Sequence, residues 1–526
     1  RFHVTECINH GRVGGNMHTS GFFGQVLKSG ILFNITHSVN SGAINGSDRV
    51  AGFFGIVECM DYMDYMVMRI TNSHNNGTIT SSGNASSYIG WLGSITQITI
   101  NECSNTGTMN ISCPTCNVGG VVGKIHTMYK SPSKHFIDIS SFTSDSLINV
   151  SCDNCTVGGL IGSITGTDQT LVSITDSVIN GSLIVMSNDV GHSDIGGFLG
   201  NSLVGNDNLT ISISNCTRNS DITVENAGCV GGFIGVSADS KTNINCTIIS
   251  IHDSQAWGSI TASQTEMVGG FISELQNIQS VTITNSHNHG RIILYESLYS
   301  VVGGLIGSYS NVLNIIIVPQ IRISDSNNYG DVSSSTDYCV LGGILARVYA
   351  TLNIHIVLEK STNFGAIRAL KTAGYGGLIG SIETSIAFDV FVRKCANHGL
   401  VHLGGGRYSD PNGVGGFIGG AKDNGNMTMV LYSFENHAPI ASSSDYNMVG
   451  GLIGGFAGNG MSVLLVEKCL NNNTVNASGK TNDLGGLIGY VKTLSSMLKS
   501  STVSTMATFL RQLEQSIATS VVLLEA

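Results

Sequence analysis

Val230-Gly231-Gly232-Phe233-Ile234-Gly235 is the stretch that decides the fold, because the chain returns to this phrase at regular intervals. Close copies include Gly304-Leu305-Ile306-Gly307 and Gly377-Leu378-Ile379-Gly380. Looser copies complete a series of fourteen, from Gly21 to Gly486, with a mean spacing of about 36 residues. A fixed period of about 20 to 50 residues is typical of proteins in which one unit stacks on the next. The sequence therefore predicts one repeat array, and not the several domains that its length would otherwise suggest.

Each repeat carries two further phrases. One is a short run such as Ile211-Ser212-Ile213, in which apolar and polar residues alternate as in a β-strand with one buried face. The other follows directly in the form Ser/Cys-x-Asn-x-Gly-x-Ile/Val, as in the stretch from Ser361 to Ile367. Its first position is Ser or Cys in thirteen of fourteen copies, Phe434 being the exception, and its seventh position is apolar throughout if Cys152 is counted.

The second phrase predicts a strand, a tight turn and another strand. We expect its glycine to supply the positive φ of a sharp corner, and its Asn to hydrogen-bond both its own backbone and the Asn of the next coil. The fold class is then all-β: a single-stranded parallel β-helix of about fourteen coils with three short strands each, forming a rod about 65–70 Å long. A packing with two narrower coils per repeat would double that length.

The repeat region is expected to span residues 1–490, since the last glycine phrase ends at Gly489. Residues 491–526 lack these glycines, and Phe509, Leu510, Leu513 and Ile517 fall at helical spacing. We expect this segment to be a helical cap on the last coil or a linker into a further domain. The chain opens inside a repeat, so its first residue is expected to be a processed or trimmed end.

Composition favours an extracellular protein. The net charge of −10 comes without any run of Lys and Arg, which argues against nucleic acid and anionic membrane surfaces as partners. No window of about 18 apolar residues predicts a membrane span. Thirteen cysteines, few charges and fourteen Asn-x-Ser/Thr sequons favour a secreted or surface glycoprotein with disulfides. The candidate glycosylation sites are Asn34, Asn45, Asn76, Asn84, Asn110, Asn149, Asn154, Asn180, Asn208, Asn215, Asn245, Asn426, Asn472 and Asn476.

Two Cys-x-x-Cys phrases are the sharpest local signal: Cys113, Cys116, Cys152 and Cys155. Cys116 and Cys155 occupy the same phase of adjacent coils, so their Cα atoms should lie within about 5–6 Å, the disulfide range. We expect disulfides among these four cysteines, without a fixed pairing. A zinc site with four thiolate ligands and a set of buried reduced thiols are the alternatives.

Five other cysteines occupy the Ser/Cys position and are expected to be small buried thiols; they are Cys7, Cys103, Cys216, Cys395 and Cys469. The histidines at the turn (His10, His289, His398 and His437) are mostly not in neighbouring coils, so we interpret them as solvated turn residues and not as a metal ladder.

A polysaccharide-cleaving β-helix would need carboxylates clustered in one phase of consecutive coils. Four aspartates share the position before Ser, but lysines replace them further along; the residues are Asp145, Asp176, Asp253, Asp325, Lys360, Lys394 and Lys468. We interpret this position as scattered polar residues. The sequence therefore predicts no catalytic, metal-binding or cofactor-binding residue, and we expect the protein not to be an enzyme.

The glycine phrase followed by Ile-x-x-Ser/Cys-x-Asn-x-Gly-x-Ile resembles the GLUG-type repeats of secreted and surface adhesins, over about residues 4–490. It is also similar to the Gly-Gly-Ala-Ile and Phe-x-x-Asn repeats of polymorphic outer-membrane adhesins, although Phe before the Asn is missing here. Both resemblances imply a parallel β-helix displayed outside the cell, in adhesive or structural roles without cofactors.

The predicted function is an extracellular structural or adhesive β-helix scaffold, as a subunit of a surface adhesin or extracellular filament. Its expected partners are further copies of the chain, or a host or surface glycan or protein. The alternative is a carbohydrate-active β-helix enzyme, either a polysaccharide lyase or a glycosidase. A third possibility is a passive spacer that lifts another domain off the surface.

Overall fold

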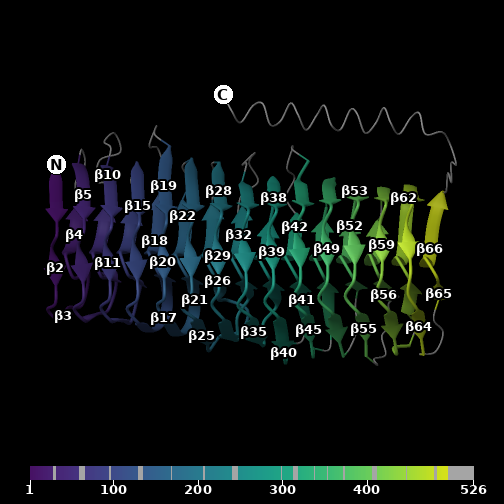
Figure 1. The fold of residues 1–526 in the computed structure, drawn as a ribbon, viewed down its shortest axis with the longest axis horizontal. Helices are drawn as coiled ribbons and strands as arrows, with labels where there is room; N and C mark the ends of the chain where they lie inside the picture. The colour runs from purple at the N-terminus through teal and green to yellow at the C-terminus, as the bar shows by residue number, and fades with distance from the viewer. Residues whose placement is uncertain are drawn as a thin grey trace.

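The described strands of the computed structural model form one elongated stack with the first coil at one end and the last coil at the other (Figure 1). The structure describes residues 1–495 except 28–30, 59–65, 94–95, 128–133, 167–168, 205–207, 240–246, 298, 312–317, 337, 352, 371–373, 405–411, 424, 446 and 479–482. Each coil pairs in parallel with the next, as in the pairing of β33 (Ile248–His252) with β38 (Ser280–Thr284). The predicted parallel β-helix is confirmed.

Three sheets run the length of the stack, with 27, 14 and 25 strands. The 14-stranded sheet, which we call the middle sheet, contributes one strand per coil. The 27- and 25-stranded sheets, which we call the outer sheets, each contribute two strand segments per coil in most coils, because the chain bends between them. One coil thus runs through β32 (Ile234–Asp239), β33, β34 (Gln255–Ala256), β35 (Ile260–Ser263) and β36 (Met267–Gly269).

The middle sheet fixes the number of coils. Its partners lie one repeat apart, as Asn363 pairs with Asn397, which excludes two coils per repeat. Its fourteen strands are β2 (Ile8–Asn9), β6 (Val39–Asn40), β11 (His74–Asn75), β16 (Ser104–Asn105), β20 (Thr143–Ser144), β24 (Val178–Ile179), β29 (Thr217–Arg218), β34, β39 (His287–Asn288), β44 (Asn327–Asn328), β49 (Thr362–Asn363), β54 (Ala396–Asn397), β59 (Glu435–Asn436) and β63 (Leu470–Asn471).

The glycine doublet marks a bend between two strands. β31 (Cys229–Gly231) ends at the first glycine, and β32 begins after Phe233. A Cβ atom on Gly232 would lie 1.8 Å from the carbonyl oxygen of Gly270 in the next coil. Only glycine allows the two backbones to approach this closely, so the doublets stack directly on one another.

The expected positive φ at the glycine of Asn-x-Gly was wrong. The left-handed residue stands one place before the Ser/Cys position instead, as at Asp253 (φ 50°), Asp325 (φ 50°) and Lys360 (φ 47°). Six of the seven residues interpreted as scattered polar residues therefore lie at a corner, where Asn and Asp tolerate this conformation best. Asp145 does not, because Ser141 (φ 51°) is the corner residue of its coil. The glycine has another role: a Cβ atom on Gly365 would lie 1.9 Å from the carbonyl oxygen of Gly330.

The interior consists of stacks of like side chains. Phe198, Phe233 and Phe271 lie in consecutive coils with ring centroids 4.6 and 4.5 Å apart. In the fifth coil, Phe142 occupies the Ser/Cys position, and not Ser146 as the sequence alignment suggested; its amide donates to the Ser177 hydroxyl of the next coil at 3.2 Å. Two coils therefore carry Phe at this position.

The last described strand, β66 (Ile488–Ser495), continues past the predicted boundary at residue 490. The remainder of the predicted helical segment, residues 496–526, lies outside the described residues. Among the described residues, no helix offers the length and apolar character needed to cross a membrane.

Candidate interaction surface

A ladder of buried asparagines runs through the middle sheet. In β49, Asn363 Nδ2 donates to the carbonyl of Gly365 at 2.8 Å and to Asn397 Oδ1 at 2.9 Å, while its own Oδ1 accepts from Asn328 Nδ2 at 2.9 Å. The predicted hydrogen bonds between stacked asparagines are therefore confirmed. One ladder joins Asn9, Asn40, Asn75 and Asn105, and a second joins Asn288, Asn328, Asn363, Asn397, Asn436 and Asn471.

Arg218 bridges part of the interruption between the two ladders. The side chain is fully buried, and its guanidinium donates to the carbonyls of Ser220 and, at 2.6 Å, Gly258. These are the carbonyls that an Asn in β29 and an Asn in β34 would bond. The small Ala256 leaves the room for the longer side chain, so one arginine replaces two asparagines. Burial lowers the pKa of Arg218 to about 10, which leaves the group charged at neutral pH.

On the outside of the same turns, six aromatic rings form one continuous column. Adjacent centroids lie 3.7 to 5.1 Å apart, and adjacent planes are within 12° of parallel. We call this set the aromatic column; its members are Trp257, His289, Tyr329, Phe364, His398 and His437. Because the rings stack face to face, the column presents their edges to solvent.

The buried ladder positions the exposed column. Each column residue directly follows the second residue of a middle-sheet strand, and its backbone N–H donates to the carbonyl of the equivalent residue one coil earlier. Phe364 N–H bonds the Asn328 carbonyl at 2.7 Å, and His398 N–H bonds the Asn363 carbonyl at 2.7 Å. The spacing of the rings is therefore set by backbone hydrogen bonds within the rod itself, so the column is already formed in the single chain.

The column is uncharged over most of its length at neutral pH. Burial, and secondarily His287, lowers the pKa of His289. Burial, and secondarily His437, lowers the pKa of His398. Neutral rings stack without the repulsion that neighbouring imidazolium ions would experience, so the column combines apolar surface with imidazole and hydroxyl edges.

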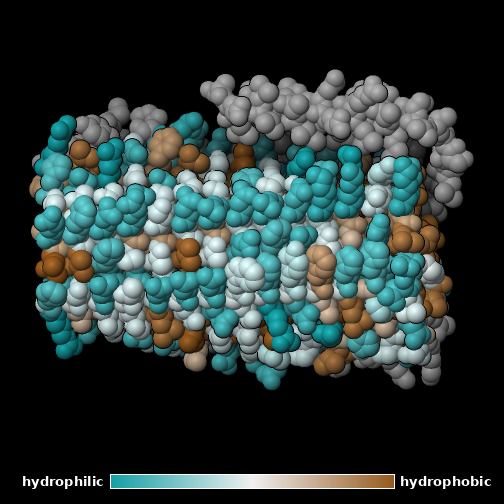
Figure 2. Space-filling model, in the orientation of Figure 1, coloured by the Kyte–Doolittle hydropathy of each residue, from teal (hydrophilic) through white to brown (hydrophobic). Residues whose placement is uncertain are grey.

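Earlier coils carry polar side chains in place of the rings. Asn180 Nδ2 donates to Asp145 at 2.7 Å, and Asn219 Nδ2 donates to Asn180 at 2.8 Å. The surface thus changes from an amide ladder to an aromatic column at Trp257. Figure 2 shows a largely hydrophilic face on which hydrophobic residues are confined to separate patches.

Only part of this surface is predicted by the sequence. The turn histidines are expected to be solvated; His398 is exposed and His289 and His437 are half-buried, and all three also stack in the column. The signal was present: the residue before the turn glycine, or before its Ala438 equivalent, is aromatic in six successive repeats from Trp257 to His437.

The four cysteines of the Cys-x-x-Cys phrases lie together. Cys113 stacks on Cys152 and Cys116 on Cys155 in paired strands, as expected. The Sγ atoms at disulfide distance belong to the same phrase, Cys113–Cys116 at 1.97 Å and Cys152–Cys155 at 2.14 Å. β17 (Met109–Gly119) and β21 (Ile148–Gly158) carry them.

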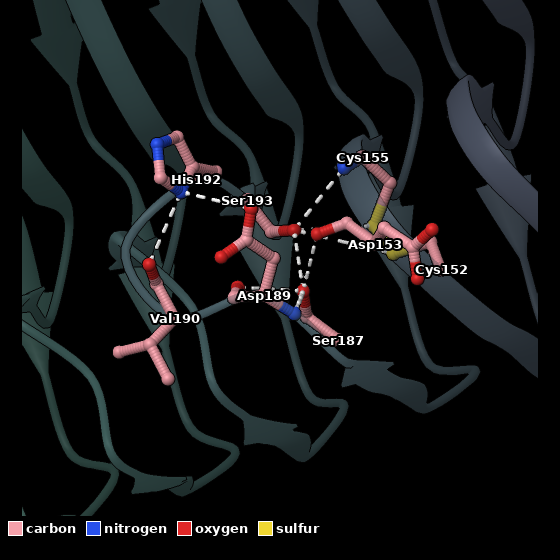
Figure 3. Close-up of polar contacts among 8 residues, drawn as sticks. All are labelled: Cys152, Asp153, Cys155, Ser187, Asp189, Val190, His192 and Ser193. Atoms are coloured by element: carbon pink, nitrogen blue, oxygen red, sulfur yellow. Dashed lines mark hydrogen bonds and ion pairs between the residues drawn. A yellow bond between two sulfur atoms is a disulfide. The ribbon is translucent and has the colours of Figure 1, made fainter.

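Serine hydroxyls lie beneath the second pair (Figure 3). The Cys155 N–H donates to Ser193 Oγ at 3.1 Å, and the Ser193 hydroxyl donates to Ser187 Oγ at 3.1 Å. His192 contacts the Asp189 carboxylate at 3.3 Å on the exposed side. Ser193 is bonded to Ser187 and not to this histidine, so these residues do not form a nucleophile–base pair.

Of the cysteines at the Ser/Cys position, Cys103, Cys216 and Cys395 are buried as predicted, whereas Cys7 is exposed and Cys469 half-buried. Burial raises the pKa of all three buried thiols to about 12, which makes them unreactive at neutral pH.

Thirteen of the fourteen sequons lie on described residues, and none of their asparagines is buried. Asn245 lies outside the described residues. Asn84 is half-buried and donates to Asp48 at 2.8 Å while accepting from Asn117 at 2.8 Å, so its side chain is already engaged.

The half-buried Asp194 and the buried Glu274 are carboxyl groups on coils that are separated by one further coil. Burial raises the pKa of Asp194 to about 7, and burial also raises the pKa of Glu274. The Cys229 thiol donates to Glu274 Oε2 at 3.4 Å, and the Asn201 amide donates to Asp194. Both carboxyl groups can therefore hold protons at a higher pH than usual. Within the described part of the chain, no three His, Cys, Asp or Glu side chains are arranged to hold a metal ion.

Comparison with known proteins gives no match to a protein family, to a curated protein or to a solved structure. The parallel β-helix class therefore stands on the structure itself, and the GLUG-type or adhesin assignment stays a prediction.

Proposed function

We propose that this chain is an extracellular or cell-surface structural scaffold, a subunit of a surface adhesin or extracellular filament, that associates with further copies of itself along its side. The observation that supports this function is the aromatic column on a rigid rod. Trp257, Tyr329 and Phe364 are 52%, 41% and 43% exposed although they are large apolar side chains. A contiguous exposed apolar strip is typical of an interaction site.

The physical argument for self-association is preorganisation. The rings are already fixed by stacking and by the backbone bonds beneath them, so their burial in a contact loses little side-chain entropy. The few residues that dominate the binding energy at protein interfaces are enriched in Trp and Tyr. Two antiparallel copies can place the same column against itself, which is the geometry of a two-fold contact. The resemblance to adhesin repeats supports the same role.

The test is sedimentation velocity and electron microscopy of the full chain and of a triple variant, Trp257→Ser, Tyr329→Ser and Phe364→Ser. We expect the wild type to form dimers or laterally associated rods and the variant to sediment as a monomer with an unchanged circular dichroism spectrum.

A matched control removes three apolar side chains of similar exposure away from the column: Met186→Ser, Tyr295→Ser and Leu370→Ser, which are 54%, 43% and 59% exposed. This control should associate like the wild type. A monomeric wild type, or equal association of the wild type and the column variant, refutes the proposed contact.

A further inference from the structure

A second surface feature lies near the other end of the rod, where two cations share one indole ring. Trp91 in β14 (Ile89–Gly93) pairs in register with Lys124 in β18 (Val122–Thr127). Lys124 Nζ lies 4.9 Å from the centroid of the Trp91 ring, and Arg49 Cζ lies 4.7 Å from it. All three side chains are half-buried and accessible from outside.

Among the described residues, only Asp48 brings a carboxylate within ion-pair distance of either cation. Lys124 makes no ion pair with any described residue, and burial and the nearby Arg49 both lower its pKa. Arg49 Nε is 3.4 Å from Asp48 Oδ2, but no hydrogen-bond partner aligns with that Nε atom. Like charges brought together at a half-buried site are unfavourable unless an anion joins them.

The two nearby acidic side chains also make other contacts. Asp48 Oδ1 accepts from both the backbone N–H and the side-chain amide of Asn84, at 3.2 and 2.8 Å. Glu58 folds over Gly93, where its Cγ lies 3.1 Å from the position that a Cβ atom would take. The indole is therefore flanked by two cations, of which Lys124 has no ion-pair partner among the described residues.

We propose that Arg49, Trp91 and Lys124 bind the sulfate or carboxylate groups of an acidic polysaccharide. A guanidinium presents paired N–H donors to an oxyanion, and an ammonium supplies a compact point charge. The indole holds both cations in place through cation–π contacts. A site of two cations on a chain of net charge −10 suits sugars with single anionic groups and not the continuous phosphate backbone of a nucleic acid. The site lies apart from the aromatic column and goes beyond the proposed scaffold role.

The experiment measures binding of the full chain to a sulfated heparin oligosaccharide, to a carboxylated oligogalacturonate and to a neutral dextran of equal length. We expect binding to at least one acidic oligosaccharide and none to dextran. Lys124→Met should weaken this binding about tenfold, the size of one charge-assisted contact. Glu58→Gln should strengthen it, because a nearby negative charge is removed.

The matched control is Arg69→Gln in β10 (Met66–Thr71), which removes one exposed cation from another face and should change binding less than about twofold. Lys124→Met should not lower the melting temperature, since it removes a half-buried unpaired charge. The proposal is overturned if Lys124→Met and Arg69→Gln weaken binding equally, or if neither acidic oligosaccharide binds better than dextran.

Discussion

Asn363→Ala tests the buried ladder that holds both the coils and the aromatic column. The Asn363 side chain is fully buried and takes part in three hydrogen bonds of 2.8 to 2.9 Å. Its removal leaves the Gly365 carbonyl, Asn397 Oδ1 and Asn328 Nδ2 each short of one partner inside the rod. At about 1–2 kcal/mol for each deprived buried group, we expect a loss of about 3–5 kcal/mol in the free energy of unfolding.

The assay is urea unfolding of the full chain followed by far-ultraviolet circular dichroism. Asn471→Ala is the matched control, because the same residue type stands at the exposed end of the ladder. There it donates to the carbonyls of Asn473 and Gly486 at 3.1 and 3.0 Å and accepts from Asn436 Nδ2 at 2.8 Å. Water can replace those bonds, so the control should lose about 1 kcal/mol. Equal losses in the two variants would refute the claim that burial makes the ladder strong.

Three further predictions concern charge, the ladder gap and the disulfides. The pKa of Asp194 is raised from 3.8 to about 7, so the folded state binds this proton more tightly and gains stability as pH falls from about 7 to about 4. Asp194→Asn should therefore raise the melting temperature at about pH 8 and not at about pH 4. A thermal scan at both pH values checks this prediction. Arg218→Asn together with Ala256→Asn should extend the second ladder from Asn288 back to position 218 and raise the melting temperature. Ala256→Asn alone should lower it, because Arg218 occupies the space. Reducing both disulfides should lower the free energy of unfolding by only about 2 kcal/mol each in urea titrations with and without reductant, because each closes a loop with a sequence separation of 3.

Most of the fold could be predicted from the repeat period, because parallel coils in register place equivalent residues at the same position in each coil. The stacking of Asn363 on Asn397 and of Cys116 on Cys155 followed from alignment alone. The backbone conformation at the corners could not be predicted from the alignment. The left-handed residue at Lys360 is one that propensity does not favour, and the turn glycine is required by the approach of the neighbouring coil, which a single repeat does not reveal.

The candidate surfaces were harder to predict, because they join residues of different type. Stacked asparagines are identical and stand out, whereas Trp257, Tyr329 and His398 are recognised as one column only after the coils are aligned. The second cluster consists of Arg49, Trp91 and Lys124, which come from three coils and from two different positions within the repeat. Comparing the same position across the repeats therefore could not find this cluster.

Photo-crosslinking from within the aromatic column tests the proposed lateral contact most directly. With p-benzoylphenylalanine in place of Phe364, irradiation of the full chain should produce a covalent dimer whose crosslinked peptide contains the column of the second copy. The same label in place of Met186 should give little dimer. Irradiation that leaves the Phe364-labelled chain monomeric, or that crosslinks both labelled chains equally, would contradict the account.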